Sequence, residues 1–252
     1  MAVLDPEVVD ERLSALLDGL GDIRPDACCA GAAGAEVPAA RLRLEAVLER
    51  RLPDARLCIV HDTRLVLAAA GLDSGIALIA GTGAVAYARS TDGREAQRGG
   101  WGWMLGDEGS GVWIAREAAR LLMMRTEKGV ARGELGDALL AATRADEAQQ
   151  LLGVLHAMHE PREWAALAQV VFDTATDDRG SADIIRRAAV ELTRLVVPLR
   201  PLVDGPVVLA GGLLLNQPLL EAAVREHVPM RCVRLEQPAV EGAVRLAAEL
   251  LR

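Results

Sequence analysis

Lysine is almost absent from this sequence. Among its 252 residues Lys128 is the sole lysine, the other 27 basic residues are arginines, and the formal net charge is −8. A Walker-type phosphate loop needs a Gly-Lys pair whose ammonium group reaches the β- and γ-phosphates, and no such pair occurs here. An acidic chain also lacks the basic face that releases counterions from a nucleic-acid backbone. We therefore expect no nucleic-acid partner, and any nucleotide must be held by another kind of phosphate grip.

Aromatic residues and long apolar runs are also scarce. Aromatic side chains make up 2% of the chain, so stacking platforms for single-stranded bases are hard to build. No unbroken apolar run approaches the roughly 18 to 20 residues of a membrane span. Residues 1–20 alternate acidic and apolar side chains, which is unlike a secretory signal peptide. We therefore expect a cytoplasmic protein without a membrane partner.

Several common metal and hydrolase patterns are missing as well. The four cysteines (Cys28, Cys29, Cys58 and Cys232) form no CxxC pair, so we expect reduced, buried thiols instead of a zinc ribbon or a disulfide framework. His156 and His159 are one helical turn apart, but no third ligand is near them in the sequence, and solvated histidines are favoured over a metal site. Neither GxSxG nor HExxH occurs, which removes the commonest hydrolase interpretations.

The spacing of apolar residues predicts alternating helices and strands, with a helix-rich middle. This order indicates an α/β fold, and the one domain boundary that we expect lies near residues 72–75. Helices are predicted over 5–20, 38–52, 63–70, 112–124, 133–145, 146–158, 163–174, 181–199, 218–227 and 239–251, and strands over 26–33, 56–61, 76–80, 84–89, 206–210 and 231–235, with a hairpin turn at Asp92-Gly93.

The segment Gly81-Thr82-Gly83 begins a formal match to the dinucleotide fingerprint GxGxxG/A. That fingerprint needs a helix directly after the glycines. Here the next residues alternate in the manner of a strand, so we predict a tight turn between two strands. Such a turn binds phosphate through successive backbone N–H groups or serves only as a hairpin turn, and both interpretations stay open.

Residues 99–111, GGWGWMLGDEGSG, are too rich in glycine for a regular helix or strand. Ordering such a loop costs backbone entropy that packing or ligand contacts must offset. Close-approach glycines, flat rings such as Trp101 and a carboxylate such as Asp107 together are typical of carbohydrate sites. The competing interpretation is that Asp107 and Glu108 cap the helix that follows them.

Two more candidate positions follow buried strands. Asp62 comes directly after the strand at 56–61, at the end where α/β sheets place their ligands, although it also suits the N-cap of the next helix. Gly211 and Gly212 follow the strand at 206–210 and suit either a nucleotide or a tight turn.

Taken in chain order, these motifs resemble the N-acetylglucosamine kinase family. The motifs that carry the resemblance are AGAAG at 30–34, VHD at 60–62, IAGTG at 79–83, GGWGWMLGDEGSG at 99–111, VLAGG at 208–212 and PAVEG at 238–242. That family groups with the activator ATPases of benzoyl-CoA reductase and hydroxyglutaryl-CoA dehydratase. The resemblance implies an actin/hexokinase-like (ribonuclease H-like) ATPase fold, with a first subdomain over 1–74, a second with added helices over 75–238, and a last helix, 239–252, that packs back on the first.

The resemblance also implies roles for the residues already singled out. Asp62 matches the catalytic base that takes the proton of the sugar 6-hydroxyl as it attacks the γ-phosphate of ATP. Gly81, Thr82 and Gly83 match a phosphate-binding turn. The sugar-binding residues implied are Gly100, Trp101, Gly102 and Asp107, and the adenosine-side turn is Gly211 and Gly212. Mg²⁺, an amino-sugar substrate and a homodimer are further implications.

Two departures from the family pattern stand out. His61 precedes Asp62 where relatives carry a small polar residue, and we expect it to tune the base. Family members also begin with a strand and a first phosphate loop, DGGGTKT, which has no counterpart in this sequence. We expect the first subdomain to be truncated and the strand at 26–33 to have an unpaired edge.

Three interpretations of the function remain: a sugar kinase, an impaired sugar- or nucleotide-binding relative, and an activator-type ATPase. The activator is disfavoured because no cysteine lies in a cluster-binding loop.

Overall fold

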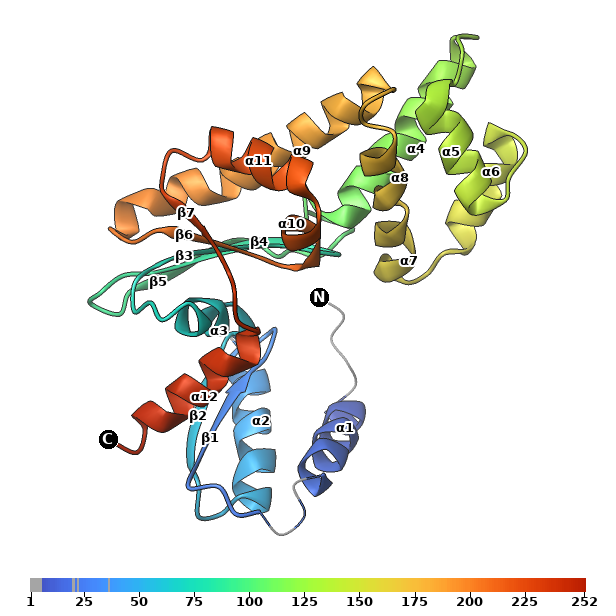
Figure 1. Cartoon of the computed structure of the whole chain (residues 1–252). Coiled ribbons are helices and arrows are strands. Elements are labelled where there is room, and N and C mark those ends of the chain that lie inside the picture. The colour runs from blue at the N-terminus through green and yellow to red at the C-terminus, as the bar shows by residue number, and fades with distance from the viewer. Residues whose placement is uncertain (1–5, 20, 22, 36) are drawn as a thin grey trace.

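The computed structural model describes residues 6–19, 21, 23–35 and 37–252, and it shows two packed units that meet at one helix (Figure 1). A small unit holds a two-stranded sheet and a large unit holds a five-stranded sheet, so the predicted α/β class is confirmed. Within these described residues, no helix has the length and the apolar character that crossing a bilayer requires.

The small unit is built on two parallel strands, with Cys29 paired opposite Cys58. One face of this sheet packs against α2 through Leu48, Leu52 and Ile59. Among the described residues β1 pairs with β2 alone, as the expected unpaired edge requires. The elements of this unit are α1 (Pro6–Asp18), β1 (Ala27–Gly31), α2 (Pro38–Arg51), β2 (Arg56–Val60), α3 (Asp62–Ala69) and α12 (Ala239–Glu249).

The large sheet has the order β5-β4-β3-β6-β7, with β3 at its centre and buried at every residue except Ile79. β3 is antiparallel to β4 and parallel to β6, so the carboxyl ends of β3 and β6 lie at the same edge. The alternation that predicted a strand after Gly83 is confirmed, because β4 begins at Ala84. The five strands are β3 (Gly75–Ala80), β4 (Ala84–Arg89), β5 (Glu95–Gly99), β6 (Val207–Ala210) and β7 (Cys232–Arg234).

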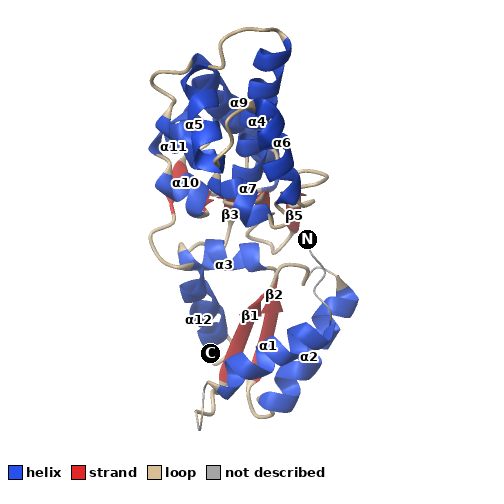
Figure 2. Ribbon diagram, turned by 90° about the vertical axis from the view of Figure 1, so that its right-hand side faces the viewer, coloured by secondary structure: helices blue, strands red, loops and turns tan. Residues whose placement is uncertain are grey.

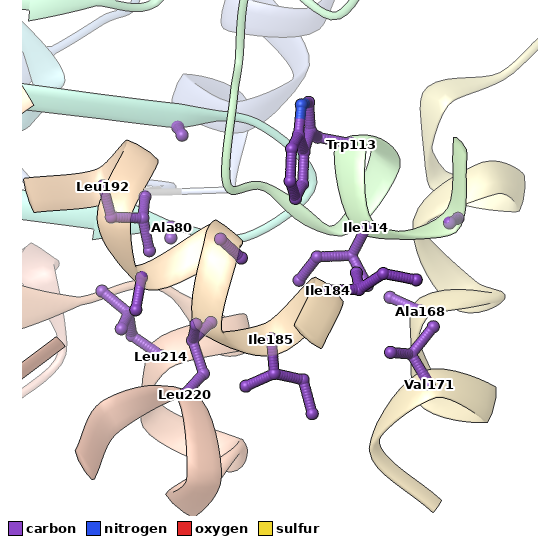
Figure 3. Close-up of a cluster of buried hydrophobic side chains, with 14 of the residues drawn as sticks. Ala80, Trp113, Ile114, Ala168, Val171, Ile184, Ile185, Leu192, Leu214 and Leu220 are labelled. Carbon is purple, nitrogen blue, oxygen red and sulfur yellow. The ribbon is translucent and has the colours of Figure 1, made fainter. Parts of the chain in front are cut away.

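Helices cover one face of the large sheet and extend beyond its edge. In Figure 1, α9 and α11 lie on the upper face, and the helices from α4 to α8 form a cluster at one end. The side chains that join these layers are close-packed, as Figure 3 shows for Ile114, Ile185 and Leu192. The helices are α4 (Gly111–Glu127), α5 (Gly133–Thr143), α6 (Ala148–Ala157), α7 (Pro161–Ala166), α8 (Ala168–Asp173), α9 (Arg179–Val196), α10 (Gly212–Asn216) and α11 (Pro218–His227), and a 3₁₀ turn spans Val197–Leu202.

The other face of the large sheet is covered by α3, which also contacts the small unit. Val66 and Leu67 of α3 pack against Ala77, Tyr87 and Val208 of the large sheet. On its other side α3 contacts α12 and β1. Figure 2 shows α3 and α12 at the junction of the two units. The last helix therefore returns to the small unit, although the large unit precedes it in the sequence.

Two local expectations are wrong in detail. The single helix expected over 163–174 is two helices, α7 and α8, because Leu167 and Val170 bond to carbonyls three residues earlier and tighten the chain there. After a turn at Gly211, the chain also forms a short helix, α10, which begins at Gly212 and was not predicted.

Candidate functional site

The turn at Gly81-Thr82-Gly83 joins β3 to β4 and rests on the start of α4. The Gly81 N–H donates to the Gly83 carbonyl at 2.9 Å, which closes the turn, and the Gly111 N–H donates to the Gly81 carbonyl at 2.9 Å. The turn is therefore a hairpin turn in its topology, and it is braced by the first residue of a long helix.

The turn after β6 lies beside this first turn. Gly211 has a φ of +89°, and a Cβ there would be 2.3 Å from the Ala80 carbonyl oxygen. Only glycine fits that backbone conformation and that approach to β3. Because β3 and β6 are parallel neighbours, both glycine turns lie at the carboxyl edge of the sheet, where α/β proteins bind ligands.

A hollow of 440 Å³ opens at these two turns. Its volume falls in the range of about 300–1,000 Å³ that is usual for small-molecule sites. Across its lining the Gln217 side-chain Nε2 donates to the Gln169 Oε1 at 2.7 Å, which links the N-cap of α11 to α8. No sequence pattern indicated this pair. The lining residues are Gly81, Thr82, Gly111, Ala165, Ala166, Ala168, Gln169, Gly212, Leu213, Asn216 and Gln217.

Asp107 places its carboxylate on the first glycine turn. The carboxylate lies near enough to the backbone N–H of Ala84 to be stabilised by it, and a Cβ on Gly83 would be 2.7 Å from its Oδ2. The residue is 8% exposed, and this burial raises the pKa of its carboxyl group. Its φ of +61° is a strained value for a residue other than glycine.

The helix-capping interpretation of Asp107 and Glu108 is wrong. The N-cap of α4 is Ser110, whose hydroxyl accepts the Trp113 N–H at 3.2 Å. Asp107 instead contacts the chain at Ala84, and Glu108 is exposed. The sequence placed the acidic pair beside the helix start correctly but did not distinguish the cap from its neighbours.

The loop between β5 and α4 is bonded to α4 on one side, and its Trp101 side chain is exposed on the other. Gly100 and Gly102 have φ values of +73° and +82°, which favour glycine. Arg116 of α4 donates from Nη1 to the Trp103 carbonyl at 3.1 Å. Trp101 is 73% exposed, so its ring is free to meet a ligand or a closing segment of chain.

Asp62 is the first residue of α3 and not its cap. The cap is His61, whose Nδ1 lies 2.7 Å from the Thr63 Oγ1 and 3.0 Å from the Asp62 Oδ1. The same Nδ1 accepts the Thr63 N–H at 3.3 Å, which caps α3, and the neighbouring His61 imidazole holds the pKa of Asp62 below its usual value. The Asp62 carboxylate is 49% exposed and ionised at neutral pH.

The structure therefore brings together some, but not all, of the predicted site residues. The two glycine turns and Asp107 lie in contact at one edge of the large sheet. Asp62 lies on α3, at the junction with the small unit, and it does not line the hollow at the turns.

Metal-binding features are few in the part of the chain that the structure describes. These residues contain no group of three or more His, Cys, Asp or Glu side chains that could hold a metal ion. The cysteines are free and only partly buried, which corrects the expectation of full burial. Cys29 and Cys58 are paired opposite one another on β1 and β2, and their proximity lowers the pKa of the Cys58 thiol.

Comparison with known proteins gives one family over nearly the whole chain. The sequence profile of the BadF/BadG/BcrA/BcrD ATPase family matches residues 7–245. An N-acetylmuramic acid/N-acetylglucosamine kinase from Clostridium acetobutylicum is 29% identical in an alignment of 255 positions. The alignment covers 92% of this chain and 82% of that protein.

Solved structures show the same architecture. A candidate N-acetylglucosamine kinase from Chromobacterium violaceum is 27% identical and superposes with a TM-score of 0.74, over 96% of this chain and 85% of that one. A second, from Porphyromonas gingivalis, is 23% identical with a TM-score of 0.74, over 98% and 86%. The predicted actin/hexokinase-like fold is thereby confirmed.

Proposed function

The chain belongs to the BadF/BadG/BcrA/BcrD ATPase family, and on that premise we propose that it transfers the γ-phosphoryl group of ATP to the 6-hydroxyl of an amino sugar, N-acetylglucosamine first among them. The 29% identical relative named for N-acetylmuramic acid and N-acetylglucosamine supports the substrate class. The reaction forms the bond between the sugar O6 and the γ-phosphorus and breaks the bond to the ADP oxygen.

ATP would occupy the hollow at the two glycine turns. Gly81, Thr82 and Gly83 would lie against the phosphates, with the backbone N–H groups of Thr82 and Gly83 as donors because the Gly81 N–H already closes the turn, and Gly211 and Gly212 would contact the adenosine side. The Gln169–Gln217 pair lines the same hollow and offers amide groups to the adenine ring. No lysine lines it, so the triphosphate charge must be met by backbone N–H groups, an arginine and Mg²⁺.

Mg²⁺ would arrive with the nucleotide. It is usually held by substrate phosphates and one or two carboxylates, without a complete protein cage. This suits a chain whose described residues hold no preformed cluster of three ligands. When bound, Mg²⁺ would neutralise charge on the phosphates.

The sugar would lie against the loop at residues 99–107. Gly100 and Gly102 allow close approach of the backbone, and the exposed Trp101 ring covers an apolar face of the sugar. The Asp107 carboxylate, which lies against the first glycine turn, would accept hydrogen bonds from ring hydroxyls.

Asp62 would act as the general base. Its lowered pKa keeps the carboxylate ionised and ready to accept the 6-hydroxyl proton as the sugar oxygen attacks. Phosphoryl transfer depends mainly on positioning and charge stabilisation, so a weak base suffices when it is well placed. We propose that the small unit, with α3, closes toward the glycine turns to place it.

The observation that carries the proposal is the contact of Asp107 with the Gly83–Ala84 backbone, because it joins the sugar loop to the phosphate turn. The test is ADP release by the wild-type chain with N-acetylglucosamine, glucosamine and N-acetylmuramic acid, together with phosphorus NMR of the product. Sugar-dependent ADP release and a 6-phosphate ester support the proposal, and ADP release that ignores every amino sugar contradicts it.

A second candidate is nucleotide binding without transfer. The hollow at the turns is complete without Asp62, so the chain can bind ADP even if the base never reaches it. Saturable ADP binding with no turnover on any sugar would select this alternative.

The domain limits of 1–74 and 75–238, a cytoplasmic location and a homodimer remain proposals. The contact of α12 with α3 and β1 supports the return of the last helix to the small unit.

A further inference from the structure

A second hollow, away from the glycine turns, lies where α3, α12 and the end of β4 meet. Its volume is 130 Å³, which is below the roughly 300–1,000 Å³ of drug-sized ligand pockets. It is therefore suited to a small ion or to one group of a larger molecule. The polar side chains of its lining are Arg64, Asp73, Arg89, Arg245 and Glu249.

Two of the three arginines are held in place by backbone carbonyls. Arg245 donates from Nη1 to the Ala68 carbonyl at 3.3 Å, and Arg89 donates from Nη1 to the Asp73 carbonyl at 2.6 Å. Gly71 makes room for the first of them, because a Cβ there would be 2.7 Å from the Arg245 Nη1. Both guanidinium groups are thus held by carbonyl oxygens, and among the described residues no carboxylate pairs with Arg245.

The third arginine, Arg64, has no hydrogen-bond acceptor and no ion-pair partner for its side chain within the described part of the chain. The groups that feel its charge are the thiols of Cys29 and Cys58 and the phenol of Tyr87. A partly buried guanidinium without an anion is costly. Arg64 is therefore a donor that the protein itself leaves unused.

Two buried polar atoms beside these arginines also lack partners. Tyr87 is 3% exposed and its hydroxyl makes no hydrogen bond of ordinary geometry, although Glu95 lies near enough to raise its pKa. The charges of Arg64 and Arg89 act on the same phenol. The Arg89 Nε is also buried without a hydrogen-bond acceptor, its nearest carboxylate oxygen being the Glu95 Oε1 at 3.6 Å.

We propose that this hollow binds a small oxyanion of the phosphate class, either inorganic phosphate or the phosphate group of a monoester. Guanidinium groups recognise such anions through parallel N–H donors. The lining holds three arginines with Asp73 and Glu249, and Glu95 pairs with Arg89 from outside it, so Arg64 and Arg245 are the guanidinium groups left to meet an anion. The small volume admits the phosphate group and keeps any organic part outside.

An anion at this position would join elements of both units. Arg64 belongs to α3, Arg245 to α12 and Arg89 to β4. Because α3 also carries Asp62, the bound anion would fix the helix on which the proposed base lies. The site itself is independent of the proposed kinase activity.

The test is calorimetric titration of the chain with inorganic phosphate, and separately with methyl phosphate, at constant ionic strength. Each titration is repeated with ADP present, so that phosphate at the glycine turns is distinguished from phosphate at the arginines. Arg64→Gln and Arg245→Gln remove site arginines. Arg186→Gln is the matched control, because Arg186 is an exposed arginine of α9.

The proposal predicts saturable binding that survives ADP and weakens by about 10-fold or more in Arg64→Gln and in Arg245→Gln, but not in the control. If one site variant does not fold, the other gives the answer. Equal affinity for inorganic phosphate and methyl phosphate would show that the site accepts a phosphate monoester. A preference for inorganic phosphate would show that it binds the free anion. Either result supports the proposed site. Binding that is lost with ADP, binding unchanged in both site variants, or no binding at about 10 mM phosphate overturns it.

Discussion

The Asp107 carboxylate lies against the backbone of Gly83, so close that a Cβ at Gly83 would be 2.7 Å from its Oδ2. This contact joins a loop between β5 and α4 to a turn between β3 and β4, two segments separated in the sequence by the strands β4 and β5. Asp107 adopts a φ of +61° at this contact, a conformation that costs about 1 kcal/mol in a residue other than glycine.

The contact predicts that Gly83→Ala damages the site more than the fold. The new methyl group would displace the carboxylate from the Ala84 N–H and move the sugar loop. We expect kcat/KM for the amino sugar to fall about 100-fold or more, with little change in far-UV circular dichroism. Gly153→Ala is the matched control, since nothing lies within 4 Å of a Cβ there. Normal kcat/KM in Gly83→Ala would show that the contact has no functional role.

The glutamine pair predicts a defect in nucleotide binding. Gln217→Ala removes the amide that donates to Gln169 at the lining of the hollow. We expect KM for ATP to rise by about 10-fold, the value of one lost hydrogen bond of about 1 kcal/mol or more, with KM for the sugar unchanged. Gln149→Ala, on the remote α6, serves as control. A larger effect on the sugar than on ATP would contradict the assignment of this hollow.

The His61–Asp62 pair predicts a change in the pH profile. His61 lowers the pKa of Asp62, so removal of the imidazole raises that pKa toward the ordinary value of 3.8. The base must be ionised to work, and activity is therefore lost at a higher pH in His61→Gln than in the wild type. The profile of kcat/KM on the acid side measures the shift. An acid limb in the same place in both proteins would mean that His61 does not tune the base.

Asp178 predicts an acid-sensitive contribution to stability. Its 3% exposed carboxylate pairs with Arg125 at 2.9 and 3.0 Å and caps α9. The Arg125 guanidinium holds the pKa of Asp178 at about 2. A lowered folded-state pKa adds stability above the unfolded pKa of about 3.9, and that stability is lost as the pH falls toward about 2.

We expect Asp178→Asn to lower the free energy of unfolding by about 2 kcal/mol at neutral pH. Asp183→Asn on the same helix is the control, because its ion pair with Arg186 is exposed and contributes about 0.5 kcal/mol or less. Urea denaturation measures both. Equal stability losses in the two variants would refute a special role for Asp178.

Periodicity and motif order predicted the strands, the main helices and the edge at which the glycine turns meet. Alternation after Gly83 distinguished a strand from a helix because side chains two residues apart share a face. The local chemistry that selects a cap was not predictable. Asp62 and Asp107 are good capping residues by type, but His61 and Ser110 hold those positions.

Contacts between distant segments lay beyond the sequence pattern. Gln169 and Gln217 are polar residues on separate helices, and no periodicity shows that their amides meet. The same is true of Arg64 on α3 and Arg245 on α12, which line one hollow although they are far apart in the sequence. Such pairs are set by tertiary packing, which one sequence does not record.

The measurement that tests the central claim most directly is the turnover of Asp62→Asn beside its affinity for ADP. The substitution keeps the shape of the side chain and removes the base. The account predicts that kcat with N-acetylglucosamine falls by about 10²–10⁴-fold while the dissociation constant for ADP stays as in the wild type, because Asp62 does not line the nucleotide hollow. Wild-type turnover in Asp62→Asn would contradict the account.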